Sequence, residues 1–148
     1  RWQAAVRELE AMQPAAPNQP LHWVKIGSLH VKCGRLDQAD EAFRKAIQLA
    51  PARPEGYVAL AQLCLHPGRD PAQAKEAAQT AVRWEPSAVN YFLLGLACDR
   101  CGDTAEAETA LRRASELDPA NLRYRQAHAA LQARRASLVP PSASENPR

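Results

Sequence analysis

The chain has few aromatic residues and no long apolar run, and these two deficits already restrict its class. Aromatic residues make up 5% of its 148 residues, which suits helices packed mainly through Ala and Leu. No stretch approaches the roughly 18 consecutive apolar residues of a membrane-spanning helix, so we expect no membrane insertion. The chain also shows no basic segment followed by an apolar one, the pattern of a secretory leader.

An excess of one charge is lacking as well. The formal net charge is +3, which is too small to indicate a nucleic-acid partner by itself. With 46% hydrophobic and 24% charged residues, the composition is neither that of a disordered chain nor that of a fibrous one. The length fits a single domain. The first residue is Arg1 and not Met, so we expect a segment of a longer protein or a processed form.

What the chain does contain is a pattern of residues that returns at a nearly constant interval. An aromatic residue is followed by an aliphatic, a small, and later another small residue, a bulky one and a proline. The leading aromatics, Trp23, Tyr57 and Tyr91, are 34 positions apart (57 − 23 and 91 − 57). A period near 34 with this pattern is typical of a helix-turn-helix repeat. Three copies are enough to bury a continuous core, so the sequence predicts an all-α stack of repeats.

Each repeat divides into two helices at residues that favour helix ends. The spacing predicts first helices over about 21–33, 55–66 and 89–101, and second helices over about 37–49, 71–84 and 104–117. Gly34 and Gly102 occupy positions where a helix ends with positive φ. Asp37, Asp70 and Asp103 are expected N-caps, and Pro51, Pro86 and Pro119 are expected to stop the second helices.

The two ends of the chain depart from the repeats. Residues 2–12 predict a helix that is either a degenerate half-repeat or an N-terminal cap, and residues 1–19 form an N-terminal helix with a Pro-rich linker. We expect a repeat domain over 20–136, with repeats at about 20–53, 54–87 and 88–121 and a capping helix over 121–136. That helix carries the first-helix pattern again, with residues such as Arg123 on its polar faces. The segment 137–148 is predicted to be a disordered tail.

These residues resemble the tetratricopeptide repeat over about 20–136. The chain departs from the family pattern at His30, Cys64 and Cys98, where a Tyr is usual, and at Ala78, where a bulky residue is usual. Ala78 suggests looser packing in the second repeat. The resemblance implies a right-handed superhelix, or α-solenoid, whose first helices line a concave groove that binds a protein or peptide partner.

The face of the first helices that the repeat pattern does not use is apolar where a solvated face would be polar. We expect this face to be the partner-binding groove. An alternative is that residues 1–20 or the tail cover it. The predicted groove residues are Val24, Lys25, Ser28, Val31, Val58, Gln62, Leu65, Val89, Phe92, Leu93, Leu96 and Arg100.

Other functions lack the residues that they need. Chaperone-binding members of the family clamp a C-terminal carboxylate with Lys, Asn and Arg, whereas the matching positions here are Val24, Ser28, Ala59, Val89 and Leu93. We therefore expect no such clamp. The cysteines and histidines show no metal-ligand spacing and no catalytic set, so we expect no metal site, no cofactor and no catalytic residue. A groove with an apolar centre also argues against reading RNA base by base.

The sequence thus predicts a protein–protein interaction module that is not an enzyme and that binds an apolar or amphipathic peptide or helix. An accessory or regulatory domain of a larger enzyme is the alternative. The alignment also predicts that Trp23 and Trp84 are largely buried, since Trp84 occupies the repeat position of Leu49 and Leu117.

Overall fold

The computed structural model describes residues 2–11 and 18–138, which form eight helices and no strand. The helices are α1 (Trp2–Ala11), α2 (Pro20–Lys32), α3 (Leu36–Leu49), α4 (Pro54–Cys64), α5 (Pro71–Trp84), α6 (Ala88–Cys101), α7 (Thr104–Leu117) and α8 (Leu122–Leu138). The prediction of an all-α stack is confirmed. Met12 and most of the predicted linker lie outside the described residues.

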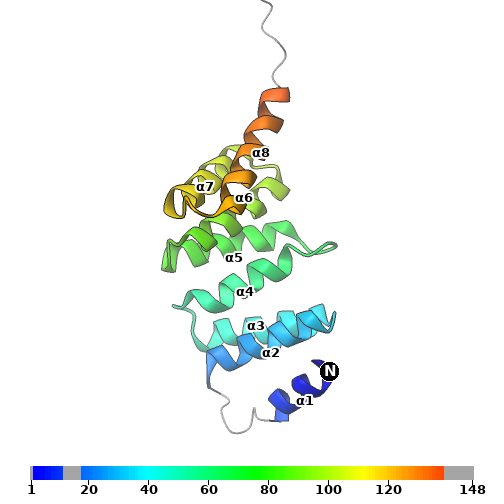
Figure 1. Ribbon diagram of the computed structural model, residues 1–148. Coiled ribbons are helices and arrows are strands. Elements are labelled where there is room, and N and C mark those ends of the chain that lie inside the picture. The colour runs from blue at the N-terminus through cyan, green and yellow to red at the C-terminus, as the bar shows by residue number, and fades with distance from the viewer. Residues whose placement is uncertain (1, 12–17, 139–148) are drawn as a thin grey trace, which may run out of the picture.

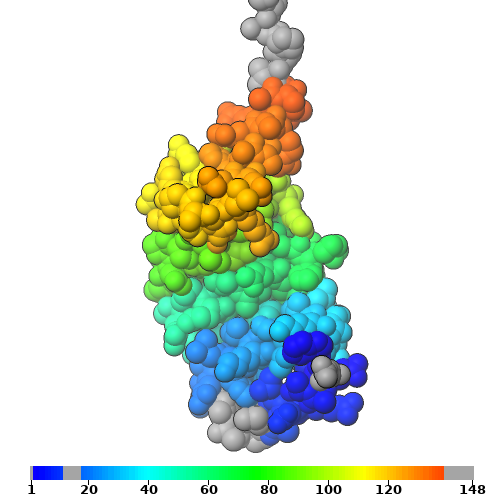
Figure 2. Space-filling model, in the orientation of Figure 1, coloured from blue at the N-terminus to red at the C-terminus, as the bar shows by residue number. Residues whose placement is uncertain are grey.

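The helices stack in chain order as three antiparallel pairs with one further helix at each end (Figure 1). The space-filling view shows one elongated body with α1 and α8 at opposite ends (Figure 2). Successive first helices pack against each other, α2 on α4 and α4 on α6. Successive second helices, α3, α5 and α7, lie further apart. The first helices therefore line the inner side of the stack.

Several helices begin at residues that supply a fixed φ or a capping oxygen. Proline stands in the first turn of α2, α4 and α5, where its missing N–H leaves no donor unsatisfied. The Asp70 carboxylate accepts a hydrogen bond of 2.9 Å from the backbone N–H of Ala72, as expected of an N-cap. Asp103 lies at the N-cap position of α7 without that bond. The prediction that Asp37 is an N-cap was wrong, because α3 begins one residue before it, at Leu36.

The predicted stops are found in the structure. Gly34 and Gly102 follow the ends of α2 and α6 with φ of 72° and 82°, a region that suits only glycine at low cost. The three second helices end two residues before their prolines, because the residue that precedes a proline is driven out of the helical region. The helix α4 ends at Cys64, two residues earlier than expected.

The core of each repeat depends on a small residue in the first helix opposite a residue of matching size in the second. A Cβ atom on Gly27 would lie 2.3 Å from the Phe43 ring, and one on Gly95 would lie 2.6 Å from Leu111. In the second repeat the same two positions hold Ala61 and Ala78, both fully buried. The second repeat thus has Ala61 where the other repeats have glycine, and the smaller Ala78 opposite it where they have Phe or Leu.

The predicted burial of Trp84 was wrong. Trp84 is 50% exposed, and Leu117 at the corresponding position is 43% exposed. Both are the last residues of their helices, so no following turn covers them. Trp23 is half-buried, which falls short of the burial predicted for it.

The helix α1 packs against α2 at the N-terminal end of the stack. This is where the second helix of a preceding repeat would lie. Glu10 meets the buried His30 at 3.0 Å (Oε1 to Nε2), and the Lys32 ammonium lies 4.5 Å from the centre of the Trp2 ring. This arrangement favours the half-repeat interpretation of α1. At the other end, α8 continues to Leu138, two residues past the expected end of the capping helix, and residues 139–148 of the predicted tail lie outside the described residues.

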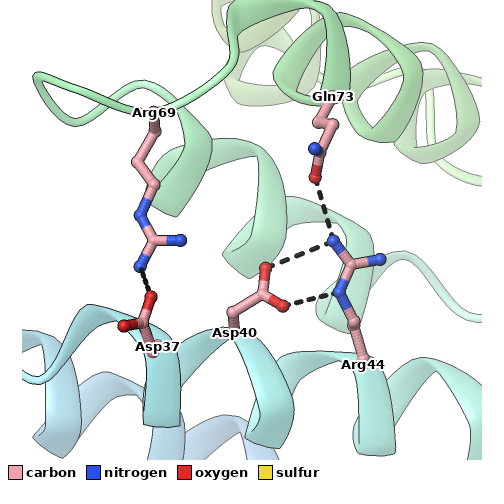
Figure 3. A network of polar contacts seen from close by, with 5 residues as sticks. All are labelled: Asp37, Asp40, Arg44, Arg69 and Gln73. Carbon is pink, nitrogen blue, oxygen red and sulfur yellow. Dashed lines mark hydrogen bonds and ion pairs between the residues drawn. The ribbon is translucent and has the colours of Figure 1, made fainter.

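Long polar side chains join each second helix to the next repeat. Figure 3 shows Asp37 paired with Arg69, and Arg44 bound to both Asp40 and Gln73. The nitrogen–oxygen distance is 2.8 Å between Arg69 and Asp37 and 2.9 Å between Arg44 and Gln73. Further along, Lys75 pairs with Asp103 and Glu106. Hydrogen bonding to Lys75 lowers the pKa of Glu106. Because the pKa of this carboxyl group is lower in the folded protein, the ionised group stabilises the fold at pH values above the ordinary carboxyl pKa. This stabilisation is lost as the pH falls through the lowered pKa.

The four cysteines are free thiols whose environments differ. Cys64 and Cys98 are buried, and burial raises the pKa of the Cys98 thiol to about 12. Since the thiolate is the reactive form, we expect an alkylating reagent near neutral pH to modify the half-exposed Cys33 first and to leave Cys64 and Cys98 unmodified. Mass spectrometry of the folded protein measures this order. Equal labelling of all four in the native state would contradict the packing, whereas equal labelling in denaturant is the control.

Candidate peptide-binding groove

Two adjoining hollows on the inner side of the stack form a groove. The first hollow, about 330 Å³, is lined by Val24, Ser28, Pro54, Glu55, Val58, Ala59, Gln62, Glu85, Val89 and Asn90. The second hollow, about 460 Å³, is lined by Gln62, Leu65, Val89, Phe92, Leu93, Leu96, Arg100, Asn121, Arg123 and Tyr124. Gln62 and Val89 belong to both, so the two hollows are continuous. Each has room for one or two side chains of a ligand.

Ten of the twelve predicted groove residues line these hollows. Lys25 and Val31 do not. Val89 is 45% exposed at the junction of the hollows, and Val24, Val58 and Leu96 are half-buried beside it. No residue of α1 lines either hollow. The described part of the N-terminal segment therefore does not cover the groove, contrary to one alternative raised by the sequence.

Phe92 and Leu93 were expected to be exposed, and this was wrong. Each is only 6% exposed. The Tyr124 ring of α8 lies 4.8 Å from the Phe92 ring between centroids, and the Arg123 guanidinium lies 5.1 Å above it. The last helix therefore covers the groove floor in the third repeat, and the apolar surface left for a partner is narrower there than the sequence indicated.

Asn90 in the first turn of α6 and Arg123 in α8 line the hollows but were not among the predicted groove residues. Asn90 is buried, and its side-chain amide donates to the carbonyls of Ala81 and Glu85, which closes the end of α5 beside the first hollow. Arg123 was assigned to the polar exterior of a cap. Its position 34 residues after Val89 was the signal that could have placed it in the groove.

The side chains that line the two hollows are apolar, amide, hydroxyl and charged groups. In the part of the chain that the structure describes, no three His, Cys, Asp or Glu residues come together in a way that could hold a metal ion. None of the described helices combines the length and apolarity that a membrane crossing requires. A larger hollow of about 520 Å³ lies between α3 and α5, but its one cation, Arg44, is already held by Asp40 and Gln73.

Stacked helix pairs with an inner groove define the class of α-helical repeat proteins that bind other polypeptides. Within this class the chain belongs to the tetratricopeptide repeat family. The family's model, described as "Tetratricopeptide repeat", matches residues 23–53 and 88–121. The second repeat, which carries Ala78 and an extra residue in its turn, lies between the two matches.

One curated relative is "Cytochrome c-type biogenesis protein CycH" of Rhizobium meliloti (strain 1021). It is 34% identical over 109 residues, which cover 71% of this chain. The matched region spans 28% of the length of that relative. The chain thus corresponds to just over a quarter of it.

Solved tetratricopeptide repeat structures share the fold. MamA from Desulfovibrio magneticus RS-1 superposes with a TM-score of 0.82 at 24% identity, over 91% of this chain and 76% of that one. The first such domain of human RPAP3 gives 0.75 at 22% identity, over 82% and 96%. YrrB, described as having an unusual peptide-binding site, gives 0.76 at 17% identity, over 88% and 67%. At these identities the likeness establishes the fold alone.

Proposed function

We propose that the groove binds an apolar or amphipathic segment of a partner polypeptide. The observation that carries this proposal is Val89, an exposed apolar side chain at the junction of two hollows and flanked by half-buried Val58 and Leu96. Single exposed apolar residues are ordinary, but a concave apolar strip rimmed by polar groups is typical of a binding surface.

The expected strength follows from the size of the strip. Burying one Val or Leu side chain against a partner contributes about 1.5–3 kcal/mol. A micromolar complex needs about 8 kcal/mol after the cost of association is met. Several anchors are therefore required, and the half-buried residues of both hollows supply them.

The partner that we propose is a polypeptide handled during cytochrome c assembly. The support is the 34% identity to a protein named for cytochrome c-type biogenesis. A haem-free cytochrome c chain exposes apolar segments that are buried once the protein has folded, and such segments suit this groove. We further propose that the chain is a binding module without catalytic activity, which agrees with a family of repeat scaffolds.

We also propose that the groove is not a chaperone carboxylate clamp built from the five positions that such members of the family use. A neighbouring structure, the first repeat domain of RPAP3, is described as bound to an HSP90 peptide. Here the first hollow contains no Lys or Arg, and Ala59 in its wall is buried. The cations that such a clamp requires are absent from that hollow.

The test is the variant Val89→Gln, measured against overlapping labelled peptides that tile a haem-free c-type cytochrome. Losing one apolar anchor should weaken binding about tenfold or more, because about 1.5 kcal/mol corresponds to a factor of ten. Fluorescence anisotropy measures the affinity. Stability should change little, since the side chain is exposed and lies in the first turn of α6.

The matched control is Leu117→Gln, which removes a similarly exposed apolar side chain from α7 on the other side of the stack. It should leave binding unchanged. If no peptide binds, the cytochrome partner is wrong. If both variants bind a peptide as the wild type does, the groove is not the binding surface.

A further inference from the structure

The two hollows of the groove carry opposite charge. The first hollow is lined by Glu55 and Glu85 and by no Lys or Arg. The second hollow is lined by Arg100 and Arg123 and by no Asp or Glu. A ligand that spans both hollows therefore meets acidic groups at one end and basic groups at the other.

The two arginines of the second hollow have no acidic partner in the described chain. Their neighbours on α8 differ in this respect, since Arg134 pairs with Asp99 at 2.7 Å and Arg135 pairs with Glu108. The two arginines that line the second hollow are therefore left without a carboxylate of this chain among the described residues.

These two arginines are held in place by neutral groups. Arg123 lies over the Phe92 ring, and its backbone N–H donates to the Asn121 side chain at 3.1 Å. Arg100 donates to the backbone carbonyl of Leu65. A guanidinium has five N–H donors in a planar fork, so each retains several donors for a ligand. Held cationic donors beside an apolar floor match a carboxylate that lies next to an apolar side chain.

We propose that the second hollow selects partner segments in which a carboxylate adjoins an apolar residue, and that this fixes the direction in which the segment lies. The inference rests on the proposed function of the groove. Arg100 and Arg123 are the residues that bind the carboxylate, while the half-buried Leu65 and Leu96 of the same hollow receive the apolar side chain. Arg100 matches none of the five positions that chaperone-binding members use, and Arg123 lies one repeat after Val89, which is one of the five.

The first hollow disfavours acidic groups of a ligand. Glu55 is paired with Arg53 at 2.6 Å, but Glu85 has no ion pair among the described residues. A second carboxylate on the ligand is therefore repelled from this end. Reversing the segment would place its acid beside Glu85 and leave both arginines without a partner, so one orientation is favoured.

The test is to select, from a displayed library of random peptides, those that bind the purified chain. One library displays peptides with free C-termini, and in the other both ends of each peptide are joined to the display protein. We expect enrichment of an acid next to apolar residues. Enrichment only in the first library identifies a terminal carboxylate, and enrichment in both identifies Asp or Glu side chains. A synthetic peptide from the selection should bind about tenfold or more weakly when its carboxylate is replaced by the amide.

The variant Arg100→Gln/Arg123→Gln should lose the acid preference and keep the apolar one. The control is Arg83→Gln/Arg125→Gln, an equal charge change at exposed positions of α5 and α8 outside both hollows. Apolar enrichment without any acid would overturn this inference and leave the groove proposal standing. No enrichment at all would overturn both. The affinities of the acid and amide peptides for the wild-type protein test the inference even if the double variant does not fold.

Discussion

Replacing Phe92 with Ala should lower the free energy of unfolding by about 3–5 kcal/mol, the usual cost of removing a buried ring. The ring is 6% exposed and holds Tyr124 of α8 at 4.8 Å between centroids. Its loss leaves a cavity between α6 and α8, so the last helix should also exchange its amide hydrogens faster. Urea denaturation followed by circular dichroism measures the stability, and hydrogen exchange locates the change.

The control for this variant is Trp84→Ala. Trp84 is the larger side chain but is 50% exposed, so its removal should cost much less than that of Phe92. Equal losses for the two variants would contradict the docking of α8 described above. Because Phe92 is buried, we also expect Phe92→Glu with Leu96→Glu to unfold the third repeat and not only to prevent binding.

Gly27→Ala should destabilise the protein by about 1–3 kcal/mol even though alanine favours helices, because the new methyl group overpacks the core. The Cβ atom would lie 2.3 Å from the Phe43 ring. Phe43→Ala alone should cost about 3–5 kcal/mol. In the Phe43→Ala background, Gly27→Ala should be neutral or stabilising, because the double variant reproduces the Ala61 and Ala78 pair of the second repeat.

A double-mutant cycle measures this coupling, which we expect to be about 1–3 kcal/mol. Ala61→Gly provides the matched reverse change, since it removes a methyl group that has space and should only destabilise. Additive effects of Gly27→Ala and Phe43→Ala would show that the two positions do not face each other. The pairing of first-helix and second-helix residues would then be wrong.

Helix positions were predictable from the sequence because local residues determine them. Gly34 and Gly102 permit the positive φ that ends a helix, and the prolines after each second helix drive the preceding residue out of the helical region. The observed ends agree with the prediction within two residues. The start of α3 was misplaced because Asp37 is compatible with either an N-cap or the first turn.

The floor of the groove was less predictable because it depends on contacts between distant segments. The repeat pattern assigns Phe92 to the inner face, but it does not indicate that α8 folds back over it. Burial of Trp84 was misjudged for a related reason, since alignment identifies equivalent positions and not what covers them. Arg123 lines the groove because α8 lies beside α6, and the repeat pattern alone does not show this.

The polar side chains that bridge α3, α5 and α7 give the stack a mechanical property. On the inner side the repeats meet through buried apolar contacts, which are short and stiff. On the outer side they meet through exposed ion pairs such as Arg69 with Asp37, which are flexible and screened over about 8 Å at physiological ionic strength. We therefore expect the stack to change its curvature more readily than the core of any single repeat changes its packing.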